Sequence, residues 1–572
     1  MSANDEEANG LTRRGLVGGL SVGAAALIGG QGQEALAATA RNKGRWDREA
    51  DVVILGYGGA GACAAIAAHD AGAKVLVIEK QAEATHFPDT RMAAGALQCP
   101  DRDGDPKALK EYSKAMFSGE NLPWMLESDQ PPGLADALAD VWTQHSVETI
   151  DFLRSLDPDI KFIKASGPAF TNFPGARDSH YRMYFVTYTG KADTEIATKD
   201  LPKNQKMNGE AFAACLAEGL RTRKIVVQYE TRATRLLSNE DDAVIGVLAE
   251  EKGKPIRIRA NRGVIIATGG YEYGLELRRA FLEGQGGEGW AFYGCPASTG
   301  DGIEMALRLG AGLVKAGKTA GRVIGAVPLR ANGVKMGVPT DSLGSPNSIV
   351  IDSYGDRYAN ELLILSDPSR YFFYKQALVL DITKLVYARN PSWMIFDETL
   401  RVRRPIAAQG YGTTGYGLVP WAPDNQDAIA RGWILKGDTI AELAAKISEH
   451  PDNRKLMNAE HLAKTIARYN DFCAKGTDGD FGRHITAEGT INKPPYYALP
   501  LYAGGPSTKG GISADAERRV LDWKGKPIAR LFAAGEIASI FKFVEQSGAN
   551  LAECIVMGRI AGKGAANERP WI

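Results

Sequence analysis

Three glycines and one glutamate near the start of the chain have the types and spacing needed to hold a nucleotide. Gly56, Gly58 and Gly61 form a G-x-G-x-x-G turn directly after the apolar run 51–55, and Glu79 follows the next apolar run. The glycines allow a tight turn, let a pyrophosphate approach the backbone and let the following helix lie close to the strand. A carboxylate at the position of Glu79 can accept hydrogen bonds from ribose hydroxyls. These residues therefore predict dinucleotide binding.

The predicted elements around these residues occur in the order that such a site requires. The apolar, β-branched run 51–55 predicts a buried parallel strand, and residues 74–78 predict its neighbour. Between them, residues 59–71 predict an alanine-rich helix whose N-terminal amides can hold phosphate. Glycines also occur at ordinary packed turns, so the order strand, turn, helix, strand and acid carries more weight than the glycines alone.

Three later segments are expected to return to the same domain. Residues 264–267 predict a strand that ends in Ala267, Thr268 and Gly269, a tight exit beside the first glycine turn. Residues 530–533 predict another strand, which ends in Gly535 and Glu536, and residues 550–565 predict a closing helix.

The composition is that of a folded protein without a bias toward nucleic acid. The 572 residues are 44% hydrophobic and 24% charged, and 68 Lys and Arg balance 68 Asp and Glu. No overall field therefore attracts nucleic acid or an anionic membrane. The six cysteines form no CxxC or CxxCH motif, so we expect no iron–sulfur cluster, no c-type haem and no other metal site.

The fold class predicted is α/β, with a Rossmann-like dinucleotide-binding domain interrupted by an α+β substrate cap domain. The first domain would comprise residues 48–324 and 494–572. Residues 325–493 would form the cap, because aromatic residues, prolines and irregular loops are more frequent there.

The N-terminus is predicted to lie outside the fold. Residues 1–37 contain Arg13 and Arg14, a weakly apolar run and Ala35-Leu36-Ala37, which is similar to a twin-arginine export signal with a cleavage site. Residues 38–47 would be a linker. The protein would then be periplasmic or otherwise exported, with no stable membrane span; the alternative is a tail with an arbitrary arginine pair.

Ordered motifs extend over nearly everything after residue 48. They are GYGGAG (56–61), TRMAAGA (90–96), ATGGYEY (267–273), STGDGIEMALRLGAG (298–312), GDRYANE (355–361), STKGGISADAERRVLD (507–522), GKPIARLFAAGE (525–536) and SGANLAECIVMGRIAG (547–562). Together these motifs resemble the flavoprotein group of soluble fumarate reductases, urocanate reductases and 3-ketosteroid dehydrogenases, and the C-terminal motifs are closer to the ketosteroid branch.

The resemblance implies FAD as the cofactor and places it between the two halves of the first domain. Asp89 stands where membrane-bound relatives have a covalently linked histidine, so non-covalent FAD is expected. The residues implied in binding are Gly56, Gly58, Gly59, Ala60, Gly61, Glu79, Lys80, Thr90, Arg91, Ala94, Gly95, Ala267, Thr268, Gly269, Asp301, Gly535, Glu536, Asn550 and Leu551.

The chain departs from the fumarate reductases at the positions that hold a dicarboxylate. Ser507 replaces a histidine, Glu545 replaces an arginine, and the apolar segment 362–366 stands where a proton-donating arginine is expected. We therefore do not expect fumarate or succinate as the substrate, since a buried dicarboxylate facing Glu545 would be repelled. Ketosteroid dehydrogenases have a tyrosine where this chain has Glu545.

Candidate catalytic residues follow from these departures. Glu545 would be a general base, or alternatively a loop acid or a partner of Lys542. Ser547 would donate a hydrogen bond to a substrate carbonyl, or cap the following helix. The acid that polarises a ketone is sought among Tyr354, Tyr358 and Tyr371.

The function expected is an exported FAD-dependent oxidoreductase of CH–CH groups. It would desaturate, or in reverse saturate, a C–C bond beside the carbonyl of an apolar small molecule such as a steroid ketone, with hydride passing to or from flavin N5. A separate electron carrier, a quinone or a cytochrome, would be its redox partner. One alternative is a reductase of an α,β-unsaturated acid, with cations from the cap: Arg322, Arg330, Arg357 or Arg370. Another is a non-catalytic flavin electron carrier.

Overall fold

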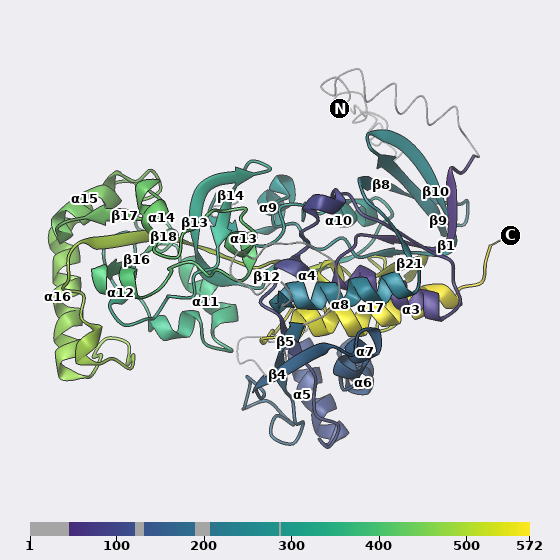
Figure 1. Ribbon diagram of the computed structural model, residues 1–572, viewed down its shortest axis with the longest axis horizontal. Coiled ribbons are helices and arrows are strands. Elements are labelled where there is room, and N and C mark those ends of the chain that lie inside the picture. The colour runs from purple at the N-terminus through teal and green to yellow at the C-terminus, as the bar shows by residue number, and fades with distance from the viewer. Residues whose placement is uncertain (1–44, 120–130, 189–205, 285–287, 572) are drawn as a thin grey trace, which may run out of the picture.

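The computed structural model describes residues 45–119, 131–188, 206–284 and 288–571. The predicted export signal, 1–37, and most of the predicted linker, 38–47, lie outside the described residues. In the described part, two β-sheet bodies lie side by side along the longest axis of the molecule (Figure 1).

The first body contains the predicted nucleotide-binding sheet. Its strands run in the order β20-β21-β10-β1-β2-β7, and β21, β10, β1, β2 and β7 are parallel. The bounds are β1 Arg48–Leu55, β2 Val75–Ile78, β7 Val226–Gln228, β10 Lys254–Ile266, β20 Arg519–Leu521 and β21 Pro527–Ala533. Strands β8 (Thr231–Ser238) and β9 (Val244–Glu251) extend it from the first half of β10. The predicted strand 264–267 is thus the last part of a longer strand, β10.

Two helices from opposite ends of the chain pack together beside this sheet. They are α3 (Gly59–Asp70), at the glycine turn, and α17 (Ala549–Asn567), near the C-terminus (Figure 1). A Cβ on Gly558 would lie 2.6 Å from the Ala60 carbonyl oxygen, and one on Gly562 would lie 2.2 Å from that of Ala64. Glycine is therefore required where the two backbones approach each other.

Further helices and a small sheet cover the other face of this helix pair. The helices are α5 (Pro106–Ser118), α6 (Leu134–Ser146), α7 (Thr149–Leu156) and α8 (Asn208–Thr222). The sheet has the order β3-β5-β4 with β6 on β5; the bounds are Ala96–Gln98, Met183–Tyr188, Ile160–Ser166 and Lys206–Met207. The core of this layer joins Trp142 and Phe541 edge to face.

The second body is the cap, built on a sheet with the order β11-β14-β13-β18-β16-β15 and β17 on β18. The bounds are β11 Trp290–Phe292, β13 Arg322–Ala331, β14 Val334–Val338, β15 Ser348–Ile351, β16 Ser392–Asp397, β17 Leu435–Gly437 and β18 Tyr496–Gly505. Its helices include α11 (Arg370–Ala377), α12 (Glu398–Arg403), α15 (Ile440–Glu449) and α16 (Ala459–Lys475). The cap sheet extends beyond both predicted boundaries of the cap, because two of its strands, β11 and β18, lie outside residues 325–493.

Strands β12 (Leu313–Thr319) and β19 (Thr508–Ile512) form a two-stranded antiparallel sheet that packs against the first body. The short helices α4 (Asp89–Met92), α9 (Leu275–Phe281) and α10 (Asp301–Leu307) complete this region. All six cysteines are described and none forms a disulfide. Among the described residues, we find no helix with the length and apolar character of a membrane span.

Candidate functional site

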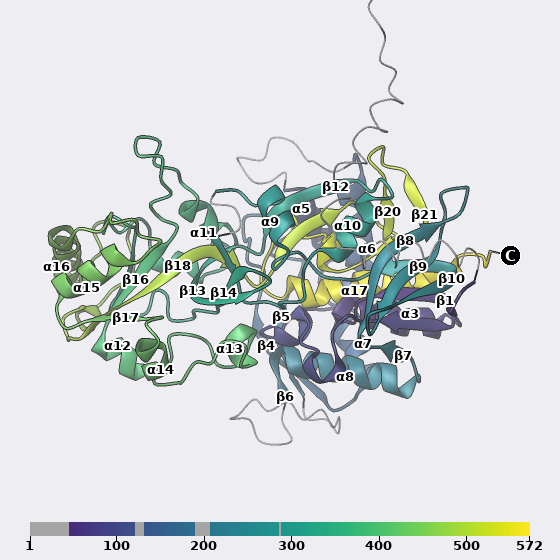
Figure 2. The same cartoon turned by 90° about the horizontal axis from the view of Figure 1, so that it is seen from above.

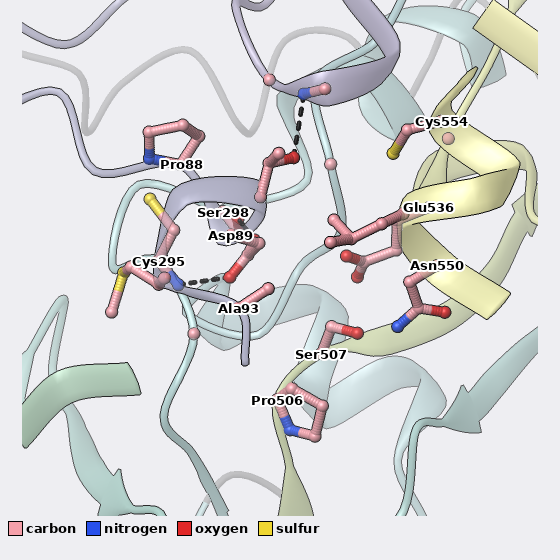
Figure 3. A pocket seen from close by; sticks show the side chains of 18 of the residues that line it. Pro88, Asp89, Ala93, Cys295, Ser298, Pro506, Ser507, Glu536, Asn550 and Cys554 are labelled. Atoms are coloured by element: carbon pink, nitrogen blue, oxygen red, sulfur yellow. Dashed lines mark hydrogen bonds between the residues drawn. The ribbon is translucent and has the colours of Figure 1, made fainter. Parts of the chain in front are cut away.

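A cavity of about 790 Å³ lies at the carboxyl ends of the parallel strands and continues to the cap. Its walls come from the glycine turn, the loop around Asp89, the exit of β10 and the segments 506–509, 534–536 and 545–554. Figure 3 shows Glu536 and Asn550, from the C-terminal part of the chain, on the opposite side of this space from Pro88. The two halves of the first domain therefore enclose one site.

The glycine turn has the geometry that its sequence predicts. Gly56 has φ +100°, and a Cβ there would lie 2.5 Å from the Ala267 carbonyl oxygen. A Cβ on Gly61 would lie 2.1 Å from the Gly56 carbonyl oxygen, so this third glycine allows helix and strand to pack closely. Buried Glu79 accepts hydrogen bonds from the backbone amides of Tyr57 (2.9 Å) and Gln81 (2.8 Å). These amides hold its carboxylate at the wall of the cavity.

The structure brings most of the predicted cofactor-binding residues to this wall. Lys80 donates hydrogen bonds to Thr299 Oγ1 (2.6 Å) and Asp301 Oδ2 (3.1 Å). The predicted residues that line the cavity are Gly56, Gly58, Gly59, Ala60, Glu79, Lys80, Thr90, Ala94, Gly95, Ala267, Thr268, Gly269, Asp301, Gly535, Glu536, Asn550 and Leu551.

Arg91 and Gly61 do not line this cavity. The Arg91 guanidinium points away from it and donates to both carboxylate oxygens of Glu210 (2.5 and 3.1 Å) and to the His86 carbonyl oxygen (2.8 Å). Arg91 therefore fixes α4 against α8 instead of touching a cofactor, which contradicts its predicted role. The role of Arg91 was predicted from the TRMAAGA motif (90–96) alone, and a sequence motif does not show the direction of a side chain.

Two half-buried carboxylates that line the cavity, Asp89 and Glu536, lie close to the buried carboxylate of Glu272. Single oxygens of Asp89, Glu272 and Glu536 lie within 4.8 Å of one another. Asp89 accepts hydrogen bonds from Cys295 N (2.5 Å; dashed line in Figure 3) and from Ser298 Oγ (2.8 Å). Burial, with the nearby charge of Glu272, raises the Asp89 pKa to about 7, and burial raises that of Glu536 well above its usual range. Asp89 is therefore partly protonated near neutral pH.

At the end of the cavity nearest the cap, Glu545 faces several cations. Burial raises its pKa, and Lys509, Lys318 and the two arginines Arg322 and Arg370 lower it in turn. Glu545 Oε2 is buried without a hydrogen-bond partner in the protein. The predicted base thus lines the cavity with a free oxygen, and it is neither a surface acid nor bonded to Lys542.

Four residues form a hydrogen-bonded group beside Glu545. The Arg370 guanidinium donates hydrogen bonds to the hydroxyls of Ser547 and Tyr371, the latter at 3.0 Å, and pairs with Asp367 (2.5 Å). Asp367 also accepts from the Ser547 amide (3.2 Å). All four line the cavity. This group places a phenol, a hydroxyl and a guanidinium where a carbonyl oxygen can be held.

Arg322, from the start of β13, adds a second guanidinium to the cavity wall. Tyr293 and Tyr411 pack edge to face near it, with ring centroids 5.9 Å apart. The Tyr411 hydroxyl donates to Asp341 Oδ1 (2.6 Å). The cap therefore contributes two arginines and three tyrosines to the site, so the apolar segment 362–366 does not leave it without cations. Arg370 supplies the charge from a few residues further along.

Tyr354 and Tyr358 are not among the residues that line the cavity. The Tyr354 hydroxyl donates to Asp381 (3.0 Å) and the Tyr358 hydroxyl to Ser392 (3.1 Å), both within the cap. This placement contradicts their predicted role and leaves Tyr371, the third tyrosine considered. The alternative cations Arg330 and Arg357 are likewise paired elsewhere, with Glu288 and with Glu361 and Asp478.

Sequence reasoning missed Tyr293, Tyr411, Asp341, Asp367 and the carboxylate of Glu272. No local motif marks the two tyrosines and the two aspartates, because they meet the site only through the packing of the cap against the first body. Glu272 lies within the ATGGYEY motif (267–273), but the motif does not show where its carboxylate points.

The residues present fit FAD. The N-termini of α3 and α17 both face the cavity and offer backbone amides for anionic groups. A Cβ on Gly58 would meet nothing closer than 3.8 Å, so this glycine borders open space. Thr268 Oγ1 is buried at the wall without a partner in the protein, as expected of a group that bonds a bound molecule.

Comparison with known proteins agrees with this geometry. Residues 51–551 match the FAD binding domain family, and the chain belongs to that family. FAD is therefore its cofactor, and the protein is an oxidoreductase that acts on CH–CH groups.

Two similar proteins illustrate the range of the family. A 3-oxosteroid 1-dehydrogenase of Mycolicibacterium smegmatis is 28% identical over 86% of this chain and 92% of its own length. A probable fumarate reductase of Shewanella frigidimarina is 25% identical over 90% of this chain and 74% of its own length.

A solved structure shares the fold. The 3-ketosteroid Δ1-dehydrogenase of Sterolibacterium denitrificans, in complex with 1,4-androstadiene-3,17-dione, superposes with a TM-score of 0.72. It is 20% identical, and the match covers 91% of this chain and 99% of that one.

Proposed function

We propose that this protein desaturates, or in reverse saturates, a C–C bond beside the carbonyl of an apolar ketone, such as a steroid or another cyclic compound. The observation that carries the proposal is the juxtaposition of Tyr371, Arg370 and Ser547 with Glu545 at one end of the cavity. Hydrogen-bond donors and a base lie within reach of one ligand there.

The division of work among these side chains follows from their chemistry. Tyr371 and Arg370 hold the carbonyl oxygen and stabilise the negative charge that develops on it. Glu545, as a carboxylate, takes the proton from the carbon next to the carbonyl, and its raised pKa makes it a better base than an exposed carboxylate. Bound FAD supplies the acceptor for the hydride that leaves the neighbouring carbon. In reduction the same groups act in reverse.

An anaerobic titration tests the proposal. A cyclic ketone with a saturated α,β bond should bleach the oxidised flavin of the holoprotein, or the matching enone should reoxidise reduced flavin. A holoprotein that responds to no ketone or enone in a broad panel would contradict the proposal. It would favour a non-catalytic electron carrier.

Arg322 supports a second candidate, a reductase of an α,β-unsaturated carboxylic acid. Two cavity-lining guanidinium groups, Arg322 and Arg370, could hold a carboxylate by paired hydrogen bonds. Burial of an anion is favourable only beside such partners. Faster reoxidation by enoates than by enones of equal size would decide for this candidate.

We also propose a separate electron carrier, a quinone or a cytochrome, and export by the predicted signal. The sequence has no CxxCH motif for a haem of its own, and residues 1–37 carry the Arg13-Arg14 pair. Reoxidation of the reduced holoprotein by a quinone analogue or by cytochrome c tests the first proposal. Retention of an Arg13→Lys, Arg14→Lys variant in the cytoplasm tests the second.

A further inference from the structure

The loop that follows α11 carries an exposed cluster of aliphatic side chains, here called the apolar tip. Val379, Leu380, Ile382 and Leu385 are 47%, 38%, 79% and 74% exposed. In Figure 2 the chain next to α11 stands out from the cap as a narrow loop. Single exposed aliphatic residues are common on protein surfaces, but four within seven residues at the end of a protruding loop are not.

The apolar tip is a structured turn. The backbones of Asp381 and Val386 are joined by two hydrogen bonds (2.8 and 3.3 Å), which close the four residues between them. The Asp381 carboxylate accepts from the amides of Thr383 (2.9 Å) and Lys384 (3.1 Å). It also accepts from the Tyr354 hydroxyl, which anchors the turn to the cap. The aliphatic side chains are therefore held outward by a defined backbone.

The backbone conformation of Leu385 also indicates that its side chain serves a contact outside the protein. It has φ +54°, in the left-handed region that large side chains rarely adopt. An exposed leucine in this conformation gains nothing from packing within the protein. A surface outside the protein would give its side chain an apolar environment.

The charges around the apolar tip favour an anionic surface. Lys384 and Lys375 are exposed, and Arg389 lies at the base of the loop beside Tyr358. The acids nearby are Asp381, whose carboxylate is turned to the amides of the turn, and Glu283, which pairs with Lys375 at 3.6 Å. The pair with Glu283 compensates Lys375, so Lys384, whose Nζ lies 3.9 Å from the centroid of the Tyr354 ring, and Arg389 supply the positive charge next to the turn.

We propose that the apolar tip inserts into the interfacial region of an anionic lipid bilayer and anchors the protein there as a peripheral membrane protein. A convex turn with aliphatic residues at its end and lysines behind it matches the pattern of interfacial insertion, in which apolar groups enter the acyl boundary and cations stay among the head groups. The turn directly follows α11, whose first residues, Arg370 and Tyr371, line the cavity. The cap would therefore be the part of the enzyme next to the lipid.

Flotation with vesicles tests this inference on the holoprotein, and the result does not depend on any substrate. The probes are vesicles of phosphatidylcholine alone and of phosphatidylcholine with phosphatidylglycerol in equal parts. The wild type should float with the anionic vesicles, less so at high salt. An Ile382→Asn, Leu385→Asn variant should bind at least tenfold more weakly. Asparagine tolerates the left-handed conformation at position 385, so this variant should keep its fold and its flavin spectrum.

Val402→Asn is the matched control, because Val402 is a single aliphatic residue, 59% exposed, on α12. It should float as the wild type does. The inference is overturned if the wild type binds neither vesicle, or if the tip variant floats as well as the control. It is also overturned if light scattering without lipid shows a wild-type dimer that the tip variant abolishes. The apolar tip would then cover a second copy of the chain.

Discussion

Lys318 and Lys509 stand directly opposite each other in the β12–β19 pair, and both lower the pKa of the buried Glu545 carboxyl. Directly opposed residues of antiparallel strands project from the same face of the sheet. Burial lowers the Lys318 pKa to about 8, so this lysine is mostly charged at neutral pH. The two lysines keep Glu545 available as a carboxylate although burial opposes its charge.

This arrangement predicts a shift in the pH dependence of flavin reduction by substrate. Glu545 is a base only when ionised, so the rate should rise as pH rises through its pKa. Lys318→Met removes a cation that lowers that pKa, and the acidic limb should move to higher pH by on the order of one unit. Lys318→Arg keeps the charge and should leave the limb nearly in place. An unchanged limb in Lys318→Met, measured by stopped flow, would show that Glu545 is not the titrating base.

Tyr371 and Tyr358 provide a matched pair of tyrosines, one at the cavity and one within the cap. Tyr371→Phe removes a donor to the substrate carbonyl and should lower the rate of flavin reduction by roughly 10²–10³. Tyr358→Phe removes only the hydrogen bond to Ser392 and should change the rate by less than about threefold. The reverse order of effects would return the donor role to Tyr358.

The effect of replacing Arg322 should show which class of substrate the protein binds. If the substrate is a neutral ketone, Arg322→Met should change reduction by ketones far less than Arg370→Met does. If it is an unsaturated acid, Arg322→Met should weaken enoate binding by about 2–5 kcal/mol, because a buried carboxylate loses its charged partner. Arg330→Met is the control, since Arg330 pairs with Glu288 outside the cavity. Dissociation constants from flavin difference spectra distinguish these outcomes.

Helix packing beneath the site gives a stability prediction. Alanine at position 562 gains about 1 kcal/mol of helix propensity over glycine, but its Cβ would lie 2.2 Å from the Ala64 carbonyl oxygen. The cost of the backbone clash should exceed the gain in helix propensity, so Gly562→Ala should lower the free energy of unfolding by about 1–3 kcal/mol. Lys563→Ala, exposed on the same helix, should change it by less than about 0.5 kcal/mol. Denaturant unfolding of both variants measures the difference, and equal stabilities would contradict the close packing of α3 and α17.

The nucleotide half of the site could be predicted because its residues are close in sequence and directly follow regular strands. Gly56 and Glu79 stand at the ends of adjacent strands, where spacing alone fixes their positions. The catalytic half could not be predicted in this way. Arg370 meets Ser547 across 177 residues, and only the packing of the cap against the first body brings them together. Similarly, no local pattern assigns β11 and β18 to the cap sheet.

The central claim is that Tyr371, Arg370 and Glu545 act together on a carbonyl compound at the flavin. Anaerobic mixing of the holoprotein with matched panels of cyclic ketones, enones, enoates and small dicarboxylates tests it most directly through the visible absorption of the flavin. We predict that a ketone bleaches the oxidised flavin, or that an enone reoxidises the reduced one, and that Glu545→Gln abolishes the response. Fastest turnover of a small dicarboxylate such as fumarate, or a full response in Glu545→Gln, would contradict the account.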